Sequence, residues 1–184
     1  FRIMIHTLIA AVLLVGIQLF PGNAVAIASS ASSTVGEKKM QYTEETFRGL
    51  SEVVDKQPDF VLETALQLLH DDEIKQNQTA LSHLYCLMAD AYREKKEHIL
   101  AIEFYHKALQ LTESAQNANI AVQINLKLGK EYYLLKEFAQ SKNHFSQVVQ
   151  MADTYEFTNE LSQAFHNLGN IDYFLGNYIE AKNH

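Results

Sequence analysis

Most of the chain carries its apolar residues at helical rather than strand spacing. Between residues 42 and 184 they recur three and four positions apart, which places them on one face of a helix. Alternation with a period of two is hard to find. Ala, Leu, Gln, Glu and Lys dominate this long section, and these residues favour helices. The pattern therefore predicts an all-α fold built from successive amphipathic helices.

The pattern also repeats when the chain is shifted by forty residues. The aligned positions are Tyr85, Met88, Ala89, Tyr92, Ala101, Tyr105 and Ala108, then Leu128, Gly129, Tyr132, Ser141, Phe145 and Val148, then Phe165, Leu168, Gly169, Tyr178 and Ala181. Each unit reads as a helix, a short turn and a second helix. A small residue in the first helix lets its partner helix approach closely. Because neither helix can bury its apolar stripe alone, we expect the hairpins to stack into an array.

Three positions depart from the repeat. Ser141 replaces the alanine of the first unit, and Asn125 stands where an aromatic residue is expected. Asp172 occupies the place of a tyrosine, and a buried aspartate is costly unless it is paired. We therefore expect the last hairpin to be looser, or Tyr173 to take over the packing.

Residues 42–78 show a weaker version of the same pattern. Phe47, Leu50 and Val54 form one apolar stripe, and Pro58 suits the start of a second helix. This segment is predicted to be a degenerate first helical hairpin.

The three units in register resemble the tetratricopeptide repeat family, whose pattern is aromatic-x-x-Leu-Gly-x-x-Tyr followed by Ala-x-x-x-Phe. The resemblance covers residues 79–184, with the last repeat truncated. It implies a right-handed α-solenoid of antiparallel helix hairpins. The family's usual period is about 34 residues, and the longer period here looks like the variant found in exported bacterial signalling proteins.

The first 28 residues read as a signal peptide or a membrane anchor. Ile3 to Phe20 is almost continuously apolar, Pro21 then breaks the helix, and Ala24-Val25-Ala26 offers a cleavage site. The alternative is a permanent anchor, because the apolar run is near the lower length limit for a membrane span. Residues 29–41 are rich in serine and are predicted to form a flexible linker. Both interpretations place the rest of the chain outside the cytoplasm, in the periplasm or beyond, with or without an anchor.

Charge and motifs exclude several classes of function. The formal net charge is −7, and acidic and basic residues are interspersed, so no basic stripe exists for nucleic acid. Cys86 is the one cysteine, which rules out a disulfide framework within the chain. The histidines show no zinc-ligand spacing, and no nucleophile or phosphate-loop motif occurs. We therefore expect no catalytic residues, metal or cofactor in these residues.

The resemblance also implies a binding surface, because the first helices of successive tetratricopeptide repeats line a concave face. Carried over by position, that face would hold His83, Cys86, Asp90, Arg93, Gln123, Leu126, Lys130, Tyr133, Gln163, His166, Asn170 and Tyr173. This mixture of amides, aromatic rings and charges of both signs suits an extended peptide. The alternative is a merely solvated face.

The expected function is therefore a protein- or peptide-binding module outside the cytoplasm. The resemblance favours the sensory or docking part of a longer bacterial membrane signalling protein, of the diguanylate cyclase or histidine kinase type. The chain ends at His184 inside a predicted helix, which agrees with that expectation. The alternative is a free periplasmic or secreted scaffold or assembly adaptor.

Overall fold

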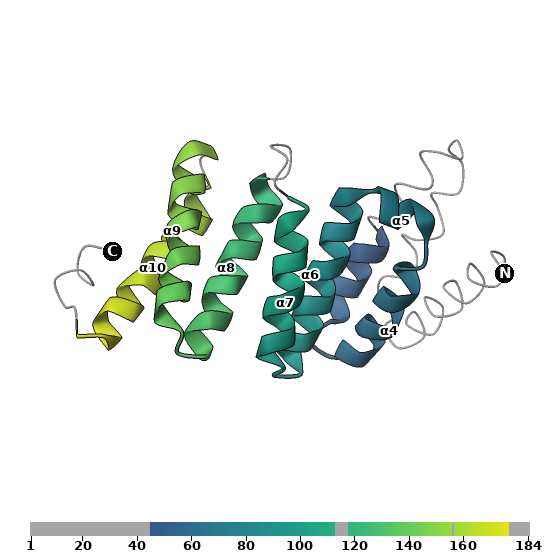
Figure 1. The fold of residues 1–184 in the computed structure, drawn as a ribbon, viewed down its shortest axis with the longest axis horizontal. Helices are drawn as coiled ribbons and strands as arrows, with labels where there is room; N and C mark the ends of the chain where they lie inside the picture. Colours follow the sequence, from purple (N-terminus) through teal and green to yellow (C-terminus); the bar gives the residue numbers. More distant parts are fainter. Residues whose placement is uncertain (1–44, 113–117, 156, 177–184) are drawn as a thin grey trace. The chain divides into compact units, whose positions relative to one another are not determined.

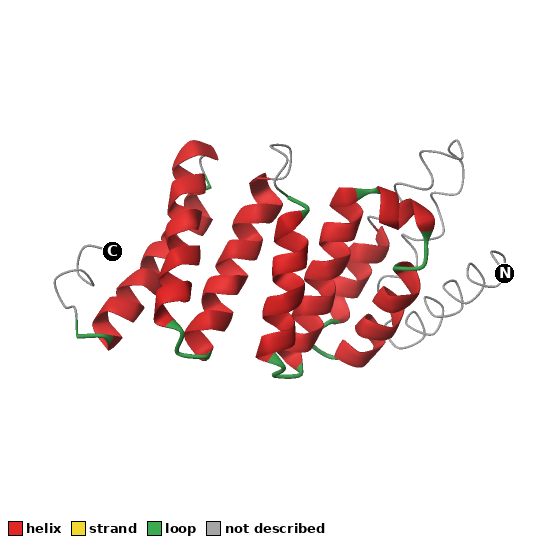
Figure 2. Cartoon of the chain, in the orientation of Figure 1, coloured by secondary structure: helices red, strands yellow, loops and turns green. Residues whose placement is uncertain are grey.

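The computed structural model describes residues 45–112, 118–155 and 157–176, and every regular element in these ranges is an α-helix (Figure 2). The prediction of an all-α fold is confirmed. The predicted signal segment and linker, residues 1–41, lie outside the described residues. Within the described ranges, no helix combines the length and the apolar character that a membrane span requires.

The helices follow one another as stacked hairpins. In chain order they are a helix over 45–53, α4 (Pro58–Leu68), α5 (Asp72–Gln76), α6 (Gln78–Glu94), α7 (His98–Gln110), α8 (Ala118–Leu134), α9 (Phe138–Tyr155) and α10 (Thr158–Phe174) (Figure 1). Helices α6 and α7 form one hairpin, and α8 and α9 form the next. The hairpins join through contacts of α7 with α8 and of α9 with α10, while α4 and α5 pack on α6. This is the expected packing of helical repeats, in which we call α6, α8 and α10 the first helices and α7 and α9 the second helices.

The end of each first helix has the same geometry at forty-residue intervals. Lys96 and Lys136 both adopt a left-handed backbone with φ of 62°, and Gly176 has φ of 80° at the same place after α10. In the first repeat the Glu97 N–H donates to the Tyr92 carbonyl at 2.9 Å, and the second repeat forms the matching bond at the same length. A left-handed residue with this backbone bond is the Schellman way of ending a helix. The turn therefore repeats with the same forty-residue spacing as the apolar stripe.

The two helices of the α8–α9 hairpin approach each other closely at Gly129. A Cβ atom built on Gly129 would lie 2.7 Å from Cε1 and Cζ of Phe145, whose side chain is fully buried. Real Cβ atoms do not tolerate such a contact with a ring held in a packed core. The predicted role of the small residue, close approach of the partner helix, is confirmed at this position.

Two departures from the repeat are satisfied by hydrogen bonds inside the α8–α9 hairpin. The hydroxyl of buried Ser141 donates to the Gly129 carbonyl at 2.7 Å. The Nδ2 of buried Asn125 donates to the Ala121 carbonyl at 2.9 Å. Both polar groups have their partners, so they fit the core without an unsatisfied donor.

The third departure, Asp172, is paired rather than replaced. Its carboxylate is fully buried and accepts a hydrogen bond from the Lys142 Nζ of α9 at 2.6 Å. Tyr173 is 69% exposed, so the expectation that it takes over the packing was wrong. The reason is that Lys142 brings a compensating charge across the α9–α10 contact, which offsets part of the cost of burying the carboxylate.

Candidate functional site

The twelve residues of the predicted surface occupy four positions that recur on α6, α8 and α10. The structure keeps the position of His83, Gln123 and Gln163 exposed in all three helices. Lys130, Asn170 and Tyr173 are also exposed, and Arg93 and Tyr133 are partly buried. These residues therefore remain on the surface, although Tyr133 also packs edge-on against Phe138 with ring centroids 5.8 Å apart.

The position of Cys86, Leu126 and His166 belongs instead to the packing between first helices. Leu126 is only 2% exposed and shares a core with Ala164 and Leu168 of α10, so its assignment to the binding surface was wrong. On α8 this side of the helix faces α10, the next first helix, and that contact buries Leu126. Burial likewise raises the pKa of the Cys86 thiol to about 12, which leaves it protonated and unreactive at neutral pH. His166 stays exposed and contacts Asn170, 3.1 Å away.

Lys127, which the sequence analysis did not assign to the surface, takes the place expected for its neighbour Leu126. Lys127 follows Gln123 by four residues and precedes Lys130 by three, so all three share one helix face. That spacing was readable in the sequence. The family register, carried over by position, favoured the adjacent residue instead.

The carboxylate of Asp90 is occupied by neighbouring side chains of the protein and is not open to a ligand. Lys127 Nζ lies 2.6 Å from its Oδ2, and Arg93 Nη1 lies 3.4 Å from its Oδ1. The hydroxyl of buried Tyr105 on α7 also donates to Oδ1. Burial, together with the negative charge of Asp90, raises the pKa of Tyr105, so the phenol remains a donor. The Asp90 side chain is 12% exposed, and its carboxylate thus forms ion pairs with two surface cations, Arg93 and Lys127.

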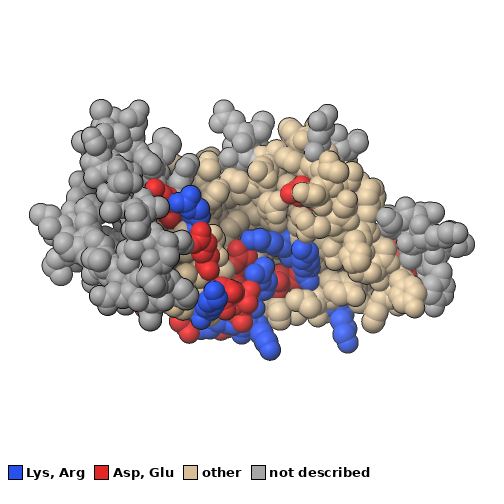
Figure 3. Space-filling view, turned by 180° about the vertical axis from the view of Figure 1, so that it is seen from behind, with Lys and Arg blue, Asp and Glu red and all other residues tan. Residues whose placement is uncertain are grey.

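Polar contacts continue from α8 to α10. Gln123 Nε2 donates to the Glu160 carboxylate at 2.6 Å, and Lys130 Nζ donates to the Gln163 side-chain oxygen at 3.2 Å. On the side of the molecule opposite to the view of Figure 1, Lys and Arg side chains gather beside Asp and Glu near the middle (Figure 3). Polar side chains of α8 therefore contact α6 through Asp90 and α10 through Glu160 and Gln163.

Two histidines meet in a separate cluster between α7, α8 and α9. The ring of His144 stacks on Tyr132, with centroids 5.4 Å apart, and lies 5.6 Å from the ring of His106. His144 Nδ1 is 2.8 Å from the Asn125 side-chain oxygen. Because the Asn125 amide group donates to Ala121, that oxygen accepts from the His144 N–H. Burial, and then the proximity of His106, lowers the pKa of His144 to about 4.

This cluster predicts a loss of stability in acid. An unfolded histidine titrates near pH 6.5. Between about pH 6.5 and pH 4, His144 is therefore protonated in the unfolded state but still neutral in the folded state. The contribution of neutral His144 to the free energy of unfolding is fully present above this pH range and falls as the pH drops through it. Urea unfolding at pH 7 and pH 4 should show the wild type losing about 2 kcal/mol more than His144→Asn, a value reduced for solvent access to the ring. Equal losses in both proteins would contradict a buried neutral His144.

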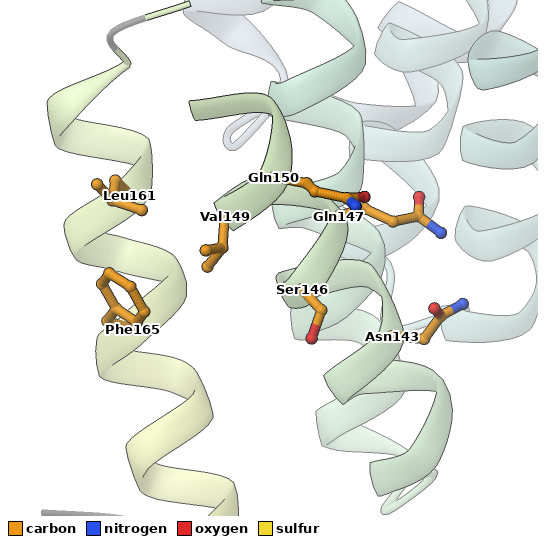
Figure 4. A pocket seen from close by; sticks show the side chains of 7 residues that line it. All are labelled: Asn143, Ser146, Gln147, Val149, Gln150, Leu161 and Phe165. Carbon is orange, nitrogen blue, oxygen red and sulfur yellow. The ribbon is translucent and has the colours of Figure 1, made fainter. Parts of the chain in front are cut away.

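A shallow hollow lies between α9 and α10 (Figure 4). Its lining consists of Asn143, Ser146, Gln147, Val149, Gln150, Leu161 and Phe165. None of these side chains is an acid, a base or an activated nucleophile, so the hollow offers no group for acid–base catalysis. Across the described ranges, no cluster of three or more His, Cys, Asp or Glu side chains could hold a metal ion. The first-helix surface is therefore the stronger candidate site.

Comparisons with known proteins agree with the repeat. Residues 82–114, which span most of α6, all of α7 and the residues after it, match the family model of the tetratricopeptide repeat. The chain is similar in fold to BtubC (BKLC) from P. vanneervenii, known from a crystal structure, with a TM-score of 0.54 and 13% sequence identity over 81% of this chain and 70% of that chain. No curated protein matches the sequence significantly. These findings support a tetratricopeptide repeat at residues 82–114 within a helical-repeat fold.

Proposed function

We propose that this chain is a protein- or peptide-binding module, and that the surface of α6, α8 and α10 binds an extended peptide. The observation that carries the proposal is the row of exposed amide side chains on successive first helices, namely Gln123 and Gln163 at one repeat position and Asn170 at another. The matched tetratricopeptide repeat supports it, since such repeats typically bind proteins or peptides.

The chemistry of the surface fits an extended backbone. A peptide in this conformation leaves N–H and C=O groups unpaired, and an amide side chain can donate to one and accept from the other. Packed helices lie about 10 Å apart, which is about three residues of extended chain. A segment that crosses three first helices would therefore need about nine residues.

A packed core lies behind the surface. Tyr105 and Phe145 of the second helices are fully buried behind it, and Asp90 fixes two of the surface cations from below. A peptide that meets a preformed surface loses less binding free energy to ordering of the protein. The arrangement therefore favours recognition over bond-breaking chemistry.

The proposal includes a place for the module. The apolar run from Ile3 to Phe20, followed by Ala24-Val25-Ala26, supports export out of the cytoplasm. Export and the forty-residue period together favour a sensory or docking part of a longer bacterial membrane signalling protein over a free scaffold. Reading the gene beyond His184 distinguishes the two, since a downstream apolar span and a cytoplasmic catalytic domain would support the first.

Removing two amides from the surface should weaken peptide binding. The probe is a labelled twelve-residue peptide, selected on the full chain from a random displayed library and titrated by fluorescence anisotropy. Because each amide hydrogen bond contributes about 1 kcal/mol, Gln123→Ala with Asn170→Ala should raise Kd about tenfold or more.

The matched control removes two exposed amides from the second helices, Gln110→Ala with Gln140→Ala, and should leave Kd unchanged. Failure to select any peptide, or equal affinity for both double variants, would refute binding on this surface.

A further inference from the structure

The cations on the candidate surface are not fully neutralised. Arg93 is paired with Asp90 and with Glu94, and Lys127 is paired with Asp90. Lys130 has no such carboxylate. Its Nζ donates to the neutral oxygen of Gln163 at 3.2 Å, and among the described residues no carboxylate lies within ion-pair distance. Three positive side chains thus share two carboxylates.

The surroundings of Lys130 also disfavour its charge. Partial burial of the amine lowers its pKa, and the positive charges of Arg93 and Lys127 lower it further. In the part of the chain that the structure describes, no negative group offsets these effects. A negative charge placed beside Lys130 would relieve the repulsion and would gain a charge-assisted hydrogen bond.

We propose that the bound peptide carries an acidic side chain whose carboxylate contacts Lys130, with Arg93 and Lys127 adding their positive field. This inference rests on the proposed function and specifies the chemistry of the ligand. Gln123 donates a hydrogen bond to the Glu160 carboxylate at 2.6 Å. Because Glu160 would repel an anion at Gln123, the anion is expected at Lys130 instead. The exposed amides Gln163 and Asn170 would let the peptide continue from Lys130 over α10.

The test uses three labelled twelve-residue peptides with alternating alanine, in which the other residue is glutamate, glutamine or lysine. Acetylated and amidated ends leave side-chain carboxylates as their only negative charges. The glutamate peptide should bind the full chain at least about tenfold more tightly than the glutamine peptide, and the lysine peptide more weakly still, because a charged hydrogen bond contributes more than a neutral one. The preference should shrink as salt is raised.

Two substitutions that each remove one positive charge locate the contact. Lys130→Gln should remove the preference for glutamate over glutamine, whereas Lys107→Gln on α7, which is paired with Glu103, should retain it. In the wild type, the pKa of Lys130, followed by NMR of the ¹³C-methylated amine, should rise when the glutamate peptide binds.

The outcomes separate the two proposals. If the glutamate and glutamine peptides bind equally, or if Lys107→Gln and Lys130→Gln behave alike, the acidic-ligand inference is overturned while peptide binding stands. If none of the three peptides and no selected peptide binds, the proposed function itself fails.

Discussion

Gly129→Leu is expected to destabilise the protein by about 3 kcal/mol or more. The added side chain would enter the space of the Phe145 ring, which already lies 2.7 Å from where a Cβ would stand. Overpacking a core costs about 1–3 kcal/mol and occasionally more, and a leucine adds three carbons beyond that first clash. Pushing the helices apart would also disturb the hydrogen bond that the Ser141 hydroxyl donates to the Gly129 carbonyl. Urea unfolding followed by circular dichroism measures the loss.

The chain contains a matched control for this substitution. Gly49 also lies in a helix, but a Cβ built there meets nothing within 4 Å. Gly49→Ala should leave stability unchanged or raise it by about 0.5–1 kcal/mol, because alanine is the better helix former. An unchanged midpoint for Gly129→Leu would show that α8 and α9 do not approach each other as described.

Leu126→Asp is expected to undock α10 from α8. Leu126 is 2% exposed in a core with residues of α9 and α10, so the change removes a buried leucine and buries a carboxylate. These effects together should cost about 4 kcal/mol or more. Because repeats stabilise mainly their neighbours, the loss should be local. Hydrogen exchange should quicken in α10 and stay slow in α6 and α7.

His166→Asp supplies the comparison at the same repeat position. His166 is exposed on α10, so the same new charge should change stability by no more than about 0.5 kcal/mol. If Leu126→Asp were as mild as His166→Asp, then Leu126 would be a surface residue, as the repeat register implies.

The architecture was predictable because its causes are local and periodic. The apolar stripes repeat every forty residues, and the turn at Lys96 repeats at Lys136 with the same backbone angle. Helix, turn and hairpin each follow from residues close together in the chain. Small residues such as Gly129 signal a close approach, which the structure shows directly.

The errors arose where side chains of different repeats meet. Leu126 and Lys127 are adjacent in sequence but lie about 100° apart around α8. Periodicity alone does not say which of the two the next helix covers. The partner of Asp172 is Lys142, thirty residues away on α9, and helical spacing gives no sign of such a pairing. Within one repeat, Tyr105 reaches Asp90 across the α6–α7 hairpin, and helical spacing does not indicate that pairing either.

The signal segment, the linker, the localisation and the longer signalling protein stay predictions, because they rest on the sequence. The binding surface has partial support of a different kind, because its exposed amides and cations lie together on the first helices. A sequence pattern could indicate which helices line the surface, but the balance of charge around Lys130 required the contacts of Arg93 and Lys127.

The most direct test of peptide binding on the first helices is the paired titration of one selected peptide on the two amide double variants. The account predicts that Gln123→Ala with Asn170→Ala raises Kd about tenfold or more, while Gln110→Ala with Gln140→Ala binds like the wild type. The reverse order, or the same Kd for both, would contradict it and would place any binding site elsewhere on the molecule.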